Sequence, residues 1–404
     1  MPTTAVAKEL IERLFRDHPT KQFAVRLWDG TEISWGPKRD FTLIFRSDAA
    51  FSRLARSADV AAFGDAYVKN DVDFEGNIEA AIALARYLRT VKIPGREKVR
   101  FALKMGGSGK HTRSDDTRDV QAHYDLSNDF YRLLLDKRMV YSCAYFRTPE
   151  MTLDQAQEEK LDLICRKLRL QKNELFLDVG CGWGALVIWA VQHYGVRAHG
   201  ITLSQKQFDL ATEQVRVAGL SDRITIEQRH YLDLPANQFD KIASIGMYEH
   251  VGIKKYPAYF TALQQALKPG GLLLNHGITV RRSTDERVGG DFISKYIFPG
   301  GELDNVPHTQ VIMEACGFEI LDVETWRRHY ARTLREWYRR LQEQETEAAK
   351  YVSTEILRSW RLYLLGFALS FDENVLNIYQ VLAAKNDATG NARVPMTRED
   401  MYRE

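Results

Sequence analysis

The fold of this chain is decided by the stretch Leu177-Asp178-Val179-Gly180-Cys181-Gly182-Trp183-Gly184. It follows a short apolar run and precedes a helical pattern, so its glycines predict a tight strand-to-helix turn whose backbone can approach a ligand. The G-C-G-W-G spacing differs from G-x-G-x-x-G and suits a ligand without a pyrophosphate. The Asp178 carboxylate could hold a cationic or hydroxyl-bearing group. Taken alone, the loop would also fit a dinucleotide, or a turn that binds nothing.

Around this loop, short apolar runs alternate with helical stretches of roughly 10 to 15 residues. Such alternation predicts a doubly wound, Rossmann-like α/β sheet with helices on both faces. Ligands of these sheets bind beyond the carboxyl ends of the strands, near the switch point. A turn at Lys268-Pro269-Gly270-Gly271 leads into the last run. The apolar runs are residues 175–179, 196–201, 224–226, 239–245 and 272–274.

The composition excludes several classes of protein. A formal net charge of +2 over 404 residues gives no signature of a nucleic-acid binder. The four cysteines form no CxxC pair, which argues against a disulfide framework or a zinc site and fits a reducing cytoplasm. The most apolar late stretch, residues 362–371, is too short to span a bilayer. A membrane substrate would therefore have to be reached from the surface.

The N-terminal part has a different pattern. Apolar residues at helical spacing predict an opening helix over residues 6–15, and alternation on both sides of Asp29-Gly30 predicts a hairpin. We expect a small α+β domain over residues 1–105, with membrane or lipid docking as its role, and a catalytic domain over 120–404. The linker between them, residues 106–119, is basic and contains glycines. The basic segment 92–118 fits either a solvated linker or contact with anionic headgroups.

Several stretches together resemble cyclopropane-fatty-acyl-phospholipid synthase and the mycolic acid cyclopropane synthases. The glycine loop and the late turn resemble those of S-adenosylmethionine (SAM) methyltransferases in general, while the other motifs are specific to the family. The resemblance covers about residues 120–379. Its motifs are HYDLS at 123–127, YSCAYF at 141–146, GMYEHVG at 246–252, NHGI at 275–278, KYIFP at 295–299 and HYARTL at 329–334.

The resemblance implies a class I SAM methyltransferase fold and a reaction. The methyl group of SAM is added to a cis double bond of an unsaturated phospholipid acyl chain, and a proton is lost to a bound bicarbonate as a cyclopropane forms. It also implies a homodimer in the cytoplasm, peripherally associated with the inner face of the membrane. A methylene- or methyl-branched product from the same site is an alternative. A non-catalytic lipid-binding protein on the same scaffold is another.

The resemblance also assigns residues. The bicarbonate cage would contain Cys143, Glu249, His276, Ile278 and Tyr330. Bicarbonate carries its own O–H donor for the Glu249 carboxylate, while His276 and the Tyr330 hydroxyl can donate to its other oxygens. Ile278 would offer a backbone group. The cofactor contacts would be Tyr141, Ser142, Asp178, Gly180, Gly182, Thr202, Gln207 and Tyr231, and no metal is expected.

Purely structural roles remain open for these residues. Cys143, His276 and Tyr330 could be core packing, and Glu249 could form a surface ion pair with Lys254 or Lys255. The second strand of many relatives ends in an acid that binds the ribose, whereas this chain has neutral residues there. Thr202 and Gln207 could replace that acid, or Ser204 and Gln207 could simply form a capping box. Apolar residues at 296–298 and 360–371 could line a substrate pocket or belong to the core.

Overall fold

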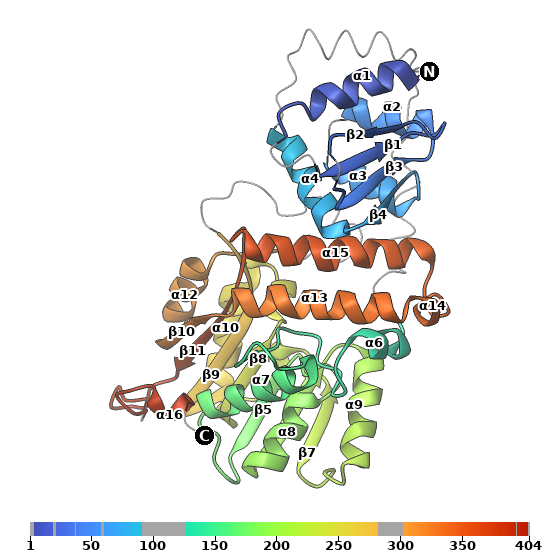
Figure 1. Cartoon of the computed structure of the whole chain (residues 1–404). Helices are drawn as coiled ribbons and strands as arrows, with labels where there is room; N and C mark the ends of the chain where they lie inside the picture. Colours follow the sequence, from blue (N-terminus) through green and yellow to red (C-terminus); the bar gives the residue numbers. More distant parts are fainter. Residues whose placement is uncertain are drawn as a thin grey trace. The chain divides into compact units, whose positions relative to one another are not determined.

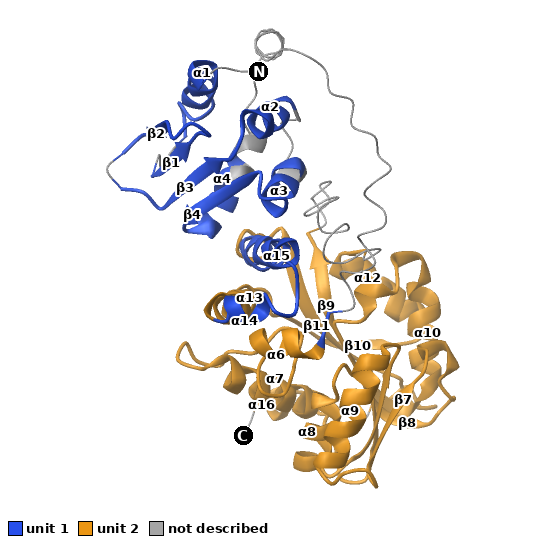
Figure 2. Ribbon diagram, turned by 90° about the vertical axis from the view of Figure 1, so that its right-hand side faces the viewer, with its two compact units in different colours: residues 1–127, 289–299, 344–369 blue, residues 128–288, 300–343, 370–404 orange. Residues whose placement is uncertain are grey.

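The computed structural model of the chain describes residues 4–18, 22–36, 38–57, 60–90, 126–281, 302–392 and 394–402. Contacts divide the chain into two compact units, which Figure 2 colours blue and orange and Figure 1 labels by element. The predicted linker 106–119, the basic segment 92–118 and the motif at 295–299 lie outside the described residues. No helix among the described residues is long and apolar enough to cross a membrane.

Unit 1 is built on a four-stranded sheet with the order β2-β1-β3-β4. β1 and β2 pair antiparallel, and the Leu27 N–H donates to the Thr31 C=O across their turn at 2.9 Å. Gly30 in that turn has a φ of 85°, where a Cβ would be strained. The predicted hairpin and opening helix are therefore confirmed. The elements are α1 (Thr4–Leu14), β1 (Phe23–Arg26), β2 (Glu32–Ser34), β3 (Phe41–Phe45), α2 (Asp48–Ser57), α3 (Val60–Val68), β4 (Val72–Gly76), α4 (Ile78–Thr90), α14 (Glu345–Ala348) and α15 (Thr354–Asp372) as far as Leu369.

The buried side chain of Arg358 connects the late helix α15 to the other elements of unit 1. Its guanidinium donates to the C=O of Tyr67 at 2.6 Å and to the C=O of Val72 at 2.8 Å. It also pairs with the Asp73 carboxylate at 3.1 Å. The sequence prediction placed this stretch in a catalytic domain running over 120–404, whereas these contacts group Gln344–Leu369 with the N-terminal elements. The predicted limits at 105 and 120 lie outside the described residues and stay predictions.

Unit 2 contains a seven-stranded sheet with the order β10-β11-β9-β8-β5-β6-β7. β5 pairs in parallel with β6 on one side and with β8 on the other, so the strand order reverses there. This is the switch point of a doubly wound sheet. β11 pairs antiparallel with both β9 and β10. The strands are β5 (Leu175–Val179), β6 (Arg197–Thr202), β7 (Ile224–Gln228), β8 (Phe239–Ile245), β9 (Leu267–Val280), β10 (Glu319–Thr325) and β11 (Leu376–Ala384).

Two apolar clusters, one on each face, hold this sheet between helices. Phe176 and Leu272 enter the cluster that contains residues of α7 and α8, while their neighbours Leu177 and Leu273 enter the cluster of α10 and α12. This is the two-residue period of a strand buried on both faces. The helices are α6 (Asn128–Leu134), α7 (Leu153–Lys167), α8 (Ala185–Tyr194), α9 (Gln205–Val217), α10 (Tyr256–Ala266), α12 (Val306–Ala315), α13 (Arg327–Glu343) and α16 (Glu399–Tyr402), with short 3-10 turns η2 (Tyr231–Asp233), η3 (Tyr248–His250) and η4 (Ile253–Lys255).

All five strands predicted from the sequence are present, but the last one is much longer than predicted. β9 runs over Leu267–Val280, so the predicted turn at 268–271 lies inside it. The register between β8 and β9 shifts between Phe239 and Lys241, opposite these residues. Gly270 there has a φ of 80°. The glycines therefore make an irregularity within a strand, and the strand continues to the candidate site.

We expect Arg358→Met to destabilise unit 1 by about 2 to 4 kcal/mol. The substitution leaves two buried carbonyl oxygens without their donor and removes the cation beside Asp73. Urea unfolding of the whole chain would measure the loss, and hydrogen exchange would place it in β3 and β4.

Arg53→Met is a matched control, because Arg53 pairs with Asp71 at 2.5 Å but is 46% exposed. It should cost less than about 1 kcal/mol. Equal losses in both variants would show that the contacts of Arg358 do not secure unit 1.

Candidate functional site

The glycine loop lies directly after β5, at the carboxyl edge of the sheet. The N–H groups of Gly180 and Cys181 both donate to the Ile201 C=O, at 2.9 and 3.0 Å, which ties the loop to β6. Gly180 and Gly182 have φ angles of 81° and 54°. A Cβ built at Gly180 would lie 2.8 Å from the Met247 side chain, whereas one at Gly182 would meet open space. The loop therefore exposes its backbone at Gly182, where a ligand can approach. Cys181 is buried.

Asp178 is the last polar side chain of β5 before the loop, and it is buried. Its Oδ1 has no hydrogen-bond partner among the described residues. Burial raises the pKa of this carboxyl to about 7, although the charge of Lys160 opposes the shift. A buried polar atom without a partner is costly in a folded protein, so this oxygen is available to a ligand.

The predicted cofactor contacts at the end of β6 lie together. The Thr202 hydroxyl donates to Gln207 Oε1 at 2.8 Å and accepts from the Ser204 N–H at 3.2 Å. Ser204 does cap α9, because its Oγ accepts from the Gln207 N–H. The reciprocal half of a capping box is not formed, since the Gln207 carboxamide is turned to Thr202. Tyr231 in η2 is half-buried and packs edge-on against Tyr259, with ring centroids 5.1 Å apart.

The segment that carries Tyr141 and Ser142 is held by α7. Gln157 Nε2 donates to the Ser142 C=O and Lys160 Nζ donates to the Ser142 Oγ, both at 2.9 Å. The Tyr141 ring packs against Trp337 of α13, with ring centroids 5.1 Å apart. Both residues predicted to contact the cofactor are thus fixed by helices on either side.

Glu249 lies in η3, just after β8, and is 7% exposed. Its Oε1 accepts from the Ile278 N–H at 2.7 Å, and its Oε2 has no partner within the described part of the chain. Burial raises the pKa of this carboxyl to about 7. The alternative of a surface ion pair with Lys254 or Lys255 is therefore wrong, because this carboxylate faces the interior. The Ile278 backbone, predicted to serve the anion, here holds Glu249 and accepts from the Tyr248 hydroxyl at 3.2 Å.

Gly277 permits this close approach of β9 to η3. A Cβ at this position would lie 1.9 Å from the Tyr248 ring and 3.0 Å from the Glu249 carboxyl carbon. Neither atom can move away, because both residues are buried. The glycine is therefore required for packing, and the sequence signal for it was its place in the NHGI motif.

His276, Cys143 and Tyr330 share Trp326 as a neighbour. The His276 ring lies 5.1 Å from the Trp326 ring, and the Cys143 Sγ lies 3.9 Å from the Trp326 C=O. The Tyr330 N–H donates to that same carbonyl at 3.0 Å. Neither ring nitrogen of His276 has a partner among the described residues, and burial keeps the pKa of the imidazole well below its usual value. Burial likewise raises the pKa of the Cys143 thiol, so both groups are neutral.

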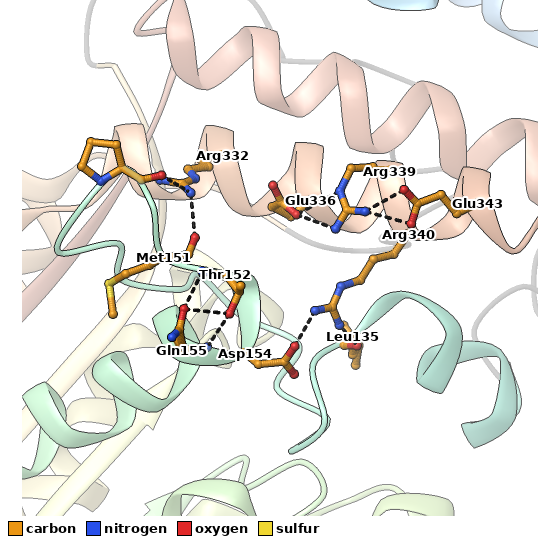
Figure 3. A network of polar contacts seen from close by, with 11 residues as sticks. Leu135, Met151, Thr152, Asp154, Gln155, Arg332, Glu336, Arg339, Arg340 and Glu343 are labelled. Carbon is orange, nitrogen blue, oxygen red and sulfur yellow. Dashed lines mark hydrogen bonds and ion pairs between the residues drawn. The ribbon is translucent and has the colours of Figure 1, made fainter.

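Helix α13, which carries Tyr330, is fastened to the start of α7 (Figure 3). Arg332 donates to the C=O of Pro149 and Met151, both at 2.8 Å. Arg340 donates to the Leu135 C=O and to Asp154, both at 2.6 Å. The helix that supplies Tyr330 is therefore held in register with the helix that supplies Gln157 and Lys160.

Lys160 and Trp326 are the two residues of this region that sequence reasoning missed. Lys160 is 2% exposed, and burial lowers the pKa of its ammonium group to about 8. The signal was present, because Gln157 and Lys160 fall on the helical face of α7 that also buries Leu161 and Ile164. A polar residue on an apolar stripe often marks a functional site. Trp326 gave no such signal, because a tryptophan at the end of a strand is expected to be an ordinary residue of the hydrophobic core.

The predicted pocket lining is described only for 360–371. Phe371 packs against the Tyr330 ring, with centroids 4.9 Å apart. Residues up to Leu369 are part of unit 1, where Tyr363 and Leu364 are buried. No group of histidine, cysteine and acidic side chains in the described residues could hold a metal ion.

Comparison with known proteins gives the following similarities. The sequence model of a family described as "Mycolic acid cyclopropane synthetase" matches residues 111–381, and a domain of unknown function matches residues 10–90. The "Probable fatty acid methyltransferase" of Pseudomonas putida is 40% identical over 383 residues, which are 94% of this chain and 96% of that protein. The "Tuberculostearic acid methyltransferase UfaA1" of Mycobacterium tuberculosis is 32% identical, covering 94% and 92%.

Solved structures also resemble this chain. The cyclopropane synthase MmaA2 from Mycobacterium tuberculosis is 34% identical with a TM-score of 0.62, covering 66% of this chain and 96% of that one. The mycolic acid cyclopropane synthase CmaA1, complexed with S-adenosylhomocysteine (SAH) and CTAB, is 36% identical with a TM-score of 0.61 and the same coverage. The sheet order and these likenesses confirm the predicted fold class, a class I methyltransferase sheet with a smaller α+β region.

We expect Glu249→Gln to be more stable than the wild type at about pH 8 and nearly equally stable at about pH 4. A carboxyl whose pKa is raised by folding binds its proton more tightly in the folded state. The wild type therefore loses stability as pH rises from 4.5, the ordinary pKa of a glutamate carboxyl, through about 7, and the variant does not. The difference at pH 8 should be roughly 3 kcal/mol by urea unfolding.

Glu314→Gln, on the exposed side of α12, serves as the control and should show the same small difference at both pH values. If the unfolding free energies of the wild type and of Glu249→Gln changed equally between the two pH values, Glu249 would not be buried in an apolar setting.

Proposed function

Because this chain belongs to the mycolic acid cyclopropane synthetase family, we propose that it methylates a cis double bond in an unsaturated acyl chain of a phospholipid, with SAM as the donor and a cyclopropane as the product. One observation carries the proposal. Glu249, a buried carboxylate, lies at the carboxyl edge of the sheet, where the strand of His276 passes. One oxygen of Glu249 and both ring nitrogens of His276 have no partner among the residues that the structure describes. That pair suits proton removal in a site closed to water.

The residues at the switch point fit SAM. Asp178 offers a buried oxygen without a partner, and Gly182 faces open space. Thr202 and Gln207 replace the usual acid with neutral groups, and the Gln207 amide nitrogen has no partner in the described structure. Tyr141, Ser142, Gly180 and Tyr231 would complete the contacts. When bound, SAM would supply an electrophilic methyl group on its sulfonium.

The cage residues fit bicarbonate. Glu249 Oε2 can accept the O–H of the anion, and a His276 nitrogen can donate to another of its oxygens. The Tyr330 hydroxyl and the neutral Cys143 thiol would complete the cage. When bound, bicarbonate would supply the base for the proton that cyclopropane formation releases. The buried rings of Trp326 and Tyr330 can stabilise positive charge on the acyl chain through their faces.

Similar proteins support a lipid substrate. Two relatives that align along nearly the whole chain are named as a probable fatty acid methyltransferase and a tuberculostearic acid methyltransferase, and one solved relative holds CTAB. We further propose that the protein is a cytoplasmic homodimer that meets its lipid at the inner membrane surface, and that the N-terminal unit assists docking.

A methyl- or methylene-branched product is the second candidate. A specific observation favours it, because relatives aligned over 94% of this chain include the tuberculostearic acid methyltransferase, whereas the cyclopropane mycolic acid synthases cover 66%. The same cage would serve both products, which differ in the proton that is lost. A non-catalytic lipid-binding role is disfavoured, because every cage residue is retained.

Purified protein incubated with SAM and liposomes of unsaturated phospholipid should add the mass of one methylene group to each modified acyl chain. Mass spectrometry of the released fatty acids, before and after hydrogenation, would separate cyclopropane from branched products. Saturated phospholipid is the matched control and should stay unchanged. Unmodified unsaturated lipid in the presence of bound SAM would contradict the proposed activity.

Glu249→Ala should lose most of the methylation rate, by about a hundredfold or more, while SAH affinity stays within about twofold. The carboxylate contacts Ile278 and faces the cage, and no contact with the glycine loop holds it. Calorimetric titration with SAH would measure the affinity. A parallel loss of SAH binding would place Glu249 in the cofactor site instead.

A further inference from the structure

The proposed anion site has a charge problem. Glu249 is a carboxylate inside the cage, yet the anion to be held there is itself negative. Neither Cys143 nor His276 can balance these charges, because burial keeps both neutral. A buried anion is stable only if positive charge or sufficient donors compensate for its lost hydration. The structure should therefore contain a cation close to the cage.

Lys160 is that cation. Its ammonium group is 2% exposed and interacts electrostatically with Asp136, Cys143, Asp178 and His276. Its hydrogen bond goes to the neutral Ser142 hydroxyl at 2.9 Å. Among the described residues, no carboxylate lies within ion-pair distance of this nitrogen, and Asp136 and Asp178 act on it only from farther away.

Lys167, two helical turns further along α7, shows the contrast. It is equally buried and also acts on His276. Its ammonium forms a direct ion pair with Glu324 and a hydrogen bond to Gln380 Oε1 at 2.8 Å. The field of Lys167 is therefore largely cancelled by Glu324. The two lysines share a helix and a degree of burial, and differ in whether a carboxylate forms a direct ion pair with them.

We propose that Lys160 is a positioning residue that joins the two parts of the site: its ammonium supplies the positive charge that retains bicarbonate beside Glu249 and His276, and its hydrogen bond fixes Ser142 at the cofactor. This inference rests on the proposed function. It explains why an unpaired lysine is kept in an apolar interior, where a methionine of similar shape would cost less. One residue thereby couples anion binding to the cofactor segment.

The test compares Lys160→Met with the wild type by titrating ¹³C-bicarbonate into the SAH complex and following the bound anion by infrared difference spectroscopy. We expect the Kd for bicarbonate to rise at least about tenfold, as one unscreened charge in a buried site can produce. The Kd for SAH should rise by less, and thermal unfolding should confirm that the variant is folded. Lys167→Met is the matched control, and its Kd for bicarbonate should change by less than about threefold.

The outcomes separate the inference from the proposed function. Wild-type protein that binds bicarbonate and methylates lipid, alongside Lys160→Met with an unchanged Kd for bicarbonate, would overturn the inference alone. Equal losses in Lys160→Met and Lys167→Met would also overturn it, since they would point to packing of α7. Wild-type protein that binds no bicarbonate would overturn both this inference and the anion part of the proposed function. Thermal unfolding far below that of the wild type would assign Lys160 a structural role.

Discussion

The cost of burying charge at the carboxyl edge of a parallel sheet governs this molecule. Asp178 and Glu249 each keep one oxygen without a partner among the described residues, and burial raises the pKa of both carboxyls to about 7. Such groups oppose folding at neutral pH, so the rest of unit 2 must offset them. It does so with two apolar clusters that enclose the sheet. The same burial therefore determines both the stability of the core and the reactivity of the site.

Rigidity around the site follows from the way separate elements are tied together. β9 continues past the irregularity at 268–271 and delivers His276, Gly277 and Ile278 beside η3. Helix α13 is anchored by Arg332 and Arg340 to the chain around the start of α7 (Figure 3). Groups that must act together on one small ligand are therefore held by the sheet and by two helices that cannot shift independently, as preorganised sites require.

More of the fold than of the candidate site could be predicted from the sequence. Periodicity and the glycine loop predicted the five strands and their class, because these are local signals. The cage residues came from a family resemblance, and the structure shows the contact of Glu249 with Ile278 and the shared neighbourhood of Trp326. Lys160 was missed because its role depends on charges brought close by folding. The direction of the Gln207 carboxamide and the grouping of α15 with unit 1 depend on side-chain contacts that no local pattern encodes.

The contacts of Arg358 have a consequence for how the protein is made. This residue follows Val72 by 286 positions, yet it donates a hydrogen bond to the Val72 C=O of β4, an edge strand of its sheet. At a synthesis rate of roughly 5 to 20 residues per second, the nascent N-terminal domain waits on the order of tens of seconds for this arginine. During that interval its edge strand is open to wrong pairing on the ribosome. Helix α15 therefore acts as a late closing element, and binding of chaperones before its emergence would protect the unfinished sheet.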